Sequence, residues 1–74
     1  MREQYIIAGS STLLNALAEV IAADPELALV ATSGPAGAPE RLVAVLPPDR
    51  VEWLRRAFGD QLTIELDEQV SPFT

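Results

Sequence analysis

The sequence YIIAGSSTLLNALAEVI, residues 5–21, decides the fold because it places an apolar strand directly before an amphipathic helix. Tyr5-Ile6-Ile7-Ala8 is a short apolar run closed by Gly9-Ser10, a pattern typical of a buried strand. Ser10 or Ser11 can cap the helix by accepting a hydrogen bond from a free backbone N–H group. The apolar residues that follow at helical spacing are Leu13, Leu14, Leu17, Ala18 and Ile21.

Two further strands are predicted after this helix. Asp24-Pro25 ends the helix, since the residue before a proline disfavours the helical region. The segments 27–32 and 41–46 are apolar and contain enough β-branched residues to form strands. Between them, residues 33–39 are rich in glycine, proline and alanine, which indicates a turn that connects the two strands.

A second helix and a last strand complete the pattern. Pro47-Pro48-Asp49 opens the helix, because proline is tolerated in the first turn and the helix dipole favours an aspartate there. Gly59 suits a left-handed cap at the other end. The predicted buried stripe of this helix consists of Val51, Leu54, Ala57 and Phe58. Apolar and polar residues then alternate over 62–66, which predicts a half-buried strand.

The predicted order of elements is strand, helix, strand, strand, helix, strand. Two right-handed crossovers on one antiparallel sheet make this an α+β fold, the ferredoxin-like βαββαβ sandwich. Such a sandwich has a four-stranded antiparallel sheet with two helices on one face, so its other face is open. We expect residues 1–67 to form this domain and residues 68–74 to be a flexible C-terminal tail, because that end has no periodicity.

The composition excludes several classes of function. A chain of 74 residues is enough for one domain, and its 49% hydrophobic content argues against disorder. The net charge of −6, from 11 acidic residues and five arginines, disfavours binding to nucleic acid or to an anionic membrane surface. The chain has no histidine and no cysteine. Disulfides and the usual zinc sites are therefore excluded, and we expect neither a metal nor a cofactor.

The sequence also argues against an enzyme. Without histidine, cysteine or lysine, it cannot form a Ser-His-Asp triad, a Cys-His pair or a Schiff base. Glu65, Asp67 and Glu68 are the carboxylates to consider for acid–base work or calcium, but solvated charges at a strand end are the commoner case. An open sheet face, an acidic rim and a tail are instead the parts of a protein-binding module.

Trp53, on the second predicted helix, has two readings. It is either partly buried at the edge of the helix or part of a binding hot spot, a role in which tryptophan is enriched.

The last third of the chain resembles a known family. LPPDRVEWL, residues 46–54, resembles the start of the second helix in subtilisin propeptides and in the related free inhibitors of fungal proteinases. GDQLTIELDEQV, residues 59–70, resembles the final strand of that family, an apolar strand that runs into an acidic pair and a valine. Tyr5-Ile6-Ile7 matches the first strand. The family's order of strands and helices is the same as the one predicted here.

The resemblance implies a partner, a subtilisin-like serine protease bound in cis or in trans, and a way of binding it. The open sheet face would pack against two surface helices of the protease. The acidic rim of Glu65, Asp67 and Glu68 would meet the positive N-terminal ends of those helices. The domain would inhibit the protease and could chaperone its folding.

The resemblance also implies a role for the tail, which would lie in the substrate cleft as an added strand. The residues concerned are Val70, Ser71, Pro72, Phe73 and Thr74. Val70 and Phe73 have the spacing of two apolar residues that fit separate subsites. The alternative is an ordinary frayed C-terminus.

Other functions stay open at this point. A small regulatory domain of the same topology could dimerise and bind an amino acid, and an assembly module could use the sheet face between copies. A recognition or leader domain for a processing enzyme is a further alternative. We expect the free domain to be a monomer or a weak dimer. It would be cytoplasmic as a free protein and secreted as part of a longer protease precursor.

Overall fold

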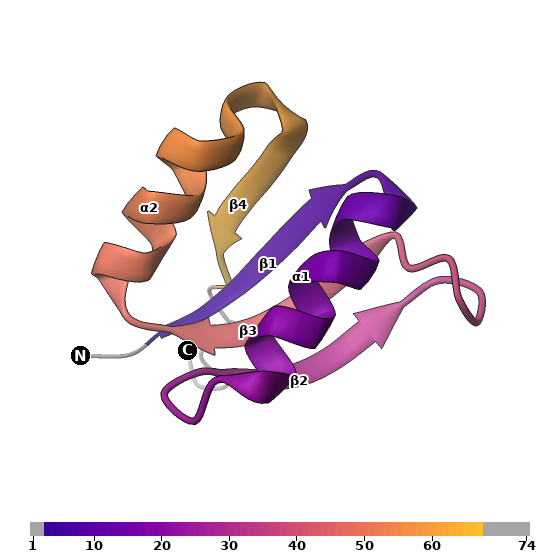
Figure 1. Ribbon diagram of the computed structural model, residues 1–74, viewed down its shortest axis with the longest axis horizontal. Helices are drawn as coiled ribbons and strands as arrows, with labels where there is room; N and C mark the ends of the chain where they lie inside the picture. The colour runs from indigo at the N-terminus through magenta and orange to yellow at the C-terminus, as the bar shows by residue number, and fades with distance from the viewer. Residues whose placement is uncertain (1–2, 68–74) are drawn as a thin grey trace, which may run out of the picture.

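The order of elements agrees with the sequence prediction. A computed structural model describes residues 3–67. Its elements are β1 (Glu3–Gly9), α1 (Ser11–Ala23), β2 (Ala28–Ser33), β3 (Arg41–Leu46), α2 (Pro48–Phe58), the 3-10 helix η1 (Gly59–Gln61) and β4 (Leu62–Leu66). The strands form one antiparallel sheet in the order β2-β3-β1-β4. Both helices lie on the same side of this sheet (Figure 1). The α+β fold with a βαββαβ arrangement is therefore confirmed.

The hydrophobic core lies between the sheet and the two helices. Ile7 on β1 pairs with Leu42 on β3 and with Ile64 on β4, and all three side chains are buried. The buried residues are Tyr5, Ile7, Leu14, Leu17, Ile21, Leu42, Ala44, Leu46, Val51, Leu54, Leu62 and Ile64. Burial of apolar side chains is the dominant favourable term in folding, so this set holds the two layers together.

The ends of α1 follow the predicted signals. Ser10 is the N-cap, and its side-chain oxygen accepts a hydrogen bond from the backbone N–H of Leu13 at 3.2 Å. The helix ends at Ala23, and the backbone N–H of Asp24 donates to the carbonyl of Ile21. The bend that follows carries the chain into β2.

Three details of the second half differ from the prediction. Gly59 has a positive φ of 55°, but its ψ of −124° lies outside the left-handed helical region, and the chain continues directly into η1. Ala57 is exposed, so the buried stripe of α2 is narrower than its sequence indicates. Leu66 is 44% exposed because it is the last residue of β4, which forms an edge of the sheet.

The loop between β2 and β3 is held against the start of α1. The hydroxyl of Ser11 donates to the carbonyl of Pro39 at 3.2 Å, and the amide of Asn15 donates to the carbonyl of Gly37 at 3.0 Å. The backbone N–H of Glu40 donates to the carbonyl of Ser33 at 2.7 Å and closes the loop. These contacts fix the direction in which β3 enters the centre of the sheet.

Candidate functional site

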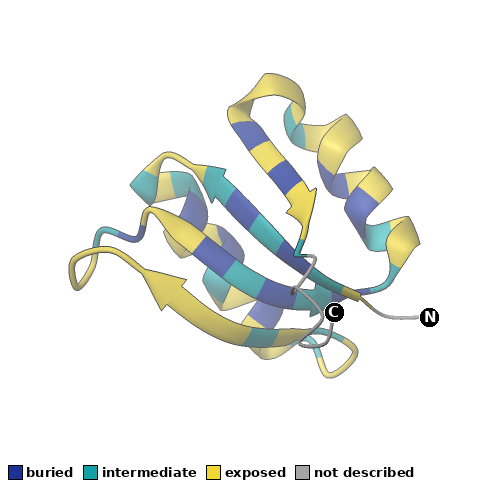
Figure 2. Ribbon diagram, turned by 180° about the vertical axis from the view of Figure 1, so that it is seen from behind, coloured by how far each residue is buried: buried dark blue, intermediate teal, exposed yellow. Residues whose placement is uncertain are grey.

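The sheet face opposite the helices is the first candidate surface, and we call it the open face. Side chains alternate along a strand, so the residues between the buried positions point to this side. Figure 2, viewed from behind, shows the strands with no helix in front of them. The half-buried residues of the two central strands on this face are Gln4, Ile6, Ala8, Val43 and Val45. The open face therefore has an apolar centre that nothing in residues 3–67 covers.

The neighbouring strands extend this surface. Ala28 and Ala31 of β2 pair with Val45 and Val43, and both alanines are exposed. At the other side, a shallow hollow of about 240 Å³ lies where β1 and β4 meet. Its lining residues are Ile6, Ala8, Arg41, Thr63 and Glu65. The open face thus combines an apolar centre with charges of both signs at its margin.

Two of the three residues predicted for the acidic rim can be placed. Glu65 pairs with Ile6 across β1 and β4, and it is exposed on the open face. Asp67 follows β4 and is tied to Gln4 twice: its backbone N–H donates to the Gln4 carbonyl at 2.8 Å, and its carboxylate accepts from Gln4 Nε2 at 2.6 Å. Glu65 is therefore the exposed carboxylate of the rim, whereas Asp67 is held by a hydrogen bond.

The remaining predicted site residues lie outside the described residues. These are Glu68 of the acidic rim and Val70, Ser71, Pro72, Phe73 and Thr74 of the tail. The part of the chain that leads to them ends beside β1, because Tyr5 pairs with Leu66 and Gln4 bonds Asp67.

An ion pair lies on the helix side of the molecule. Arg50 Nη1 on α2 donates to the carboxylate of Asp24, just after α1, at 2.9 Å. The pKa of Asp24 is lowered by the hydrogen bond from the backbone N–H of Glu26 and by the guanidinium of Arg50. Both contacts favour the ionised carboxylate. The bond from Arg50 also links the end of α1 to the start of α2.

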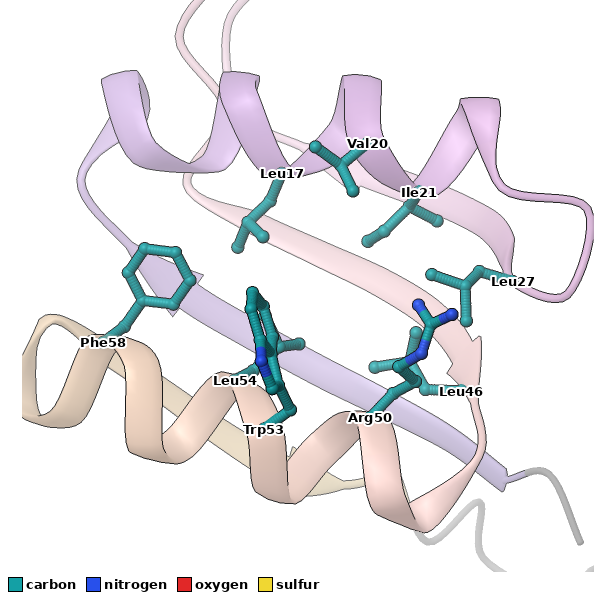
Figure 3. A pocket seen from close by; sticks show the side chains of 9 residues that line it. All are labelled: Leu17, Val20, Ile21, Leu27, Leu46, Arg50, Trp53, Leu54 and Phe58. Atoms are coloured by element: carbon teal, nitrogen blue, oxygen red, sulfur yellow. The ribbon is translucent and has the colours of Figure 1, made fainter.

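Between the two helices is a second candidate surface, an apolar cavity of about 120 Å³ that opens to solvent, which we call the helix groove. Figure 3 shows side chains from both helices directed into it. Its lining residues are Leu17, Val20, Ile21, Leu27, Leu46, Arg50, Trp53, Leu54 and Phe58. Trp53 is 61% exposed and Val20 is 58% exposed. Trp53 is therefore partly covered where it lines the groove and otherwise open to solvent, and neither of its two readings is decided by this exposure.

Sequence reasoning missed the helix groove, although one residue signals it. Val20 is apolar and lies three residues after Leu17, yet it is not among the buried residues of α1. Val20 and Trp53 point into the space between the two helices (Figure 3), and these exposed apolar side chains mark surface that both helices leave uncovered.

Residues 3–67 contain neither a candidate metal site nor a candidate membrane-spanning helix. No group of acidic residues there is arranged to hold a metal ion. Neither helix in this range has the length and apolar composition needed to cross a lipid bilayer.

Comparison of the chain with protein-family models, with curated proteins and with solved structures found no match.

Proposed function

We propose that this domain binds another protein through its open face, and that the partner is a subtilisin-like serine protease. The observation that carries the proposal is the apolar centre of the open face, where Ile6, Val43 and Val45 lie on a sheet that no described element covers. Exposed apolar patches framed by polar residues are typical of protein interaction sites. Burying this patch against a partner would supply the main favourable free energy of binding.

The margin of the open face supports a partner that presents helix ends. Glu65 is exposed beside the apolar centre, and a carboxylate in this position stabilises the positive end of a helix dipole. Arg41 lines the same hollow as Glu65 and would pair with an acidic group of the partner. Charges at the rim of an interface set orientation and association rate more than affinity.

The C-terminal residues extend the proposal to inhibition. Asp67, the last described residue, lies beside the first strand at one end of the open face, and Val70 and Phe73 follow it in the sequence. A segment that continues from there into a substrate cleft would add a strand to the protease and would compete with substrate. Docking by the open face would hold this segment at high effective concentration near the cleft.

The test is a titration of a purified subtilisin-type protease with this protein, following hydrolysis of a chromogenic peptide. We expect competitive inhibition, and we expect truncation of residues 70–74 to weaken it by orders of magnitude. The truncated protein should keep its circular dichroism spectrum and urea midpoint, because the buried core lies within residues 5–64.

The controls separate the two parts of this proposal. Equal inhibition by the truncated and the complete chain would refute the role of the tail. If a folded sample inhibits none of several such proteases, the identity of the partner is wrong.

A further inference from the structure

We propose that the helix groove is a binding site for a small uncharged apolar molecule, about the size of a single six-membered ring. The groove lies on the helix side of the sheet, and the open face lies on the other side (Figure 1). Both surfaces can therefore be occupied at once, and the proposal does not depend on which protein binds the open face.

The floor of the helix groove belongs to the hydrophobic core, so the folded domain itself fixes its shape. The buried side chains that line it are Leu17, Ile21, Leu46 and Leu54. They come from both helices and from β3, which are packed together whether or not a ligand is bound. Ligand sites in proteins are usually formed largely in advance and are lined mainly by apolar side chains, as this groove is.

Water is a poor occupant of this groove. A well-held water molecule in a protein makes about two to four hydrogen bonds. The lining side chains offer polar atoms only at Arg50 and at the indole nitrogen of Trp53 (Figure 3). Because an apolar group that displaces poorly held water gains affinity, the groove favours an apolar ligand over solvent.

The charges around the groove disfavour an ionic ligand. Arg50 is the only charged residue that lines the groove, and its Nη1 atom already bonds the carboxylate of Asp24 at 2.9 Å. Asp49, which is exposed, lines the adjoining hollow together with Arg50. An anion would therefore meet Asp24 and Asp49, whereas a cation would meet Arg50. Either ion would also lose hydration over an apolar floor, a cost that an uncharged ligand does not have.

The volume of the groove sets the size of the ligand. The groove has a volume of about 120 Å³. An engineered apolar cavity of about 150 Å³ in another protein, lined by leucine, isoleucine and phenylalanine side chains, binds benzene. A single ring with a methyl group therefore suits the helix groove, whereas a molecule with two fused rings or a long chain would extend into solvent.

The experiment is a titration of the protein with toluene, followed by proton NMR. Trp53 is the only tryptophan in the chain and lines the groove, so its indole N–H signal should shift and saturate at millimolar toluene. Toluene at about five times its dissociation constant should also raise the Tm by about 5 °C. Benzoate and benzylammonium carry the same ring with opposite charges, and each should bind about tenfold more weakly or worse.

Two matched variants test the place of binding. Val20 is 58% exposed and points into the groove, so Val20→Phe should fill it and weaken toluene binding about tenfold or more. Val30 is 52% exposed but lies on β2 and does not line the groove, so Val30→Phe should bind toluene as wild type does.

Three results would overturn the proposal. The first is a Trp53 signal that does not shift saturably with toluene, and the second is a charged analogue that binds as tightly as toluene. Both are measured on the wild-type chain, so they do not depend on how a variant folds. The third is equal binding of toluene by wild type and by a folded Val20→Phe protein.

Discussion

Replacement of two adjacent isoleucines by alanine tests the assignment of the two faces of β1. Ile7 is fully buried and faces the helices, whereas Ile6 is half-buried on the open face. Both side chains lie in the same central strand, and each pairs with β3 and β4. The intrinsic loss of strand propensity, up to about 1 kcal/mol, is therefore common to both variants.

The magnitude for Ile7→Ala follows from its burial. Ile7→Ala removes three buried carbons, which at about 0.8 kcal/mol each costs about 2.4 kcal/mol in transfer free energy. The cavity left behind raises the loss to about 3–4 kcal/mol. A domain of this length has a free energy of unfolding of about 4–11 kcal/mol, so the variant should lose a large part of its stability. Ile6→Ala removes the same three carbons from a half-buried position, so it should cost less than about 1.5 kcal/mol.

The assay is urea unfolding followed by circular dichroism. With a slope of about 1 kcal/mol per M, Ile7→Ala should lower the midpoint by about 3 M, and Ile6→Ala by about 1 M. An Ile7→Ala protein that is unfolded without urea agrees with the larger loss. Equal midpoints for the two variants, or a greater loss in Ile6→Ala, would refute the assignment of the faces.

Two other substitutions test local features. Gly9→Ala would bring a Cβ atom to 2.9 Å from the carbonyl oxygen of Gln61. We therefore expect the free energy of unfolding to fall by about 1–3 kcal/mol, measured as a lower Tm. An unchanged Tm would contradict the close approach. Asp24→Asn tests the lowered pKa of Asp24: its ionised carboxylate stabilises the fold above the ordinary pKa of 3.8, and this contribution disappears as pH falls through the lower folded value. The variant should therefore be less stable than wild type at pH 7, and the gap should close below about pH 4; a gap independent of pH would refute this account.

The helices and strands could be predicted because buried apolar residues recur in the sequence at the spacing of a helix or a strand. The predicted strand 41–46 agrees with β3. Ser10 sets the start of α1, and Asp24 with the proline that follows it sets the end. Leu66 lies in the predicted strand 62–66 but is exposed, because alternation gives the side of the sheet on which a residue lies and not its distance from the edge. Strand alternation indicates an open face without showing what covers it.

The helix groove could not be predicted because it depends on the spacing between two helices distant in sequence. Periodicity locates the buried stripe of each helix separately, and Leu17 and Leu54 fit those stripes. The space between the stripes, and the exposure of Val20 and Trp53 beside it, depend on how both helices lie on the sheet. The sequence places Glu65 and Asp67 close together in the chain, but the hydrogen bond between Asp67 and Gln4 requires the pairing of β1 with β4.

The central claim, that the open face docks on a protease, is tested most directly by comparing two variants on opposite sides of the sheet. Val43→Asp puts a charge at the apolar centre of the open face, and Trp53→Ala changes the helix groove. With both variants shown to be folded, the inhibition constant for a subtilisin-type protease should rise about tenfold or more for Val43→Asp. It should be unchanged for Trp53→Ala. Unimpaired inhibition by Val43→Asp, or a loss confined to Trp53→Ala, would contradict docking through the open face.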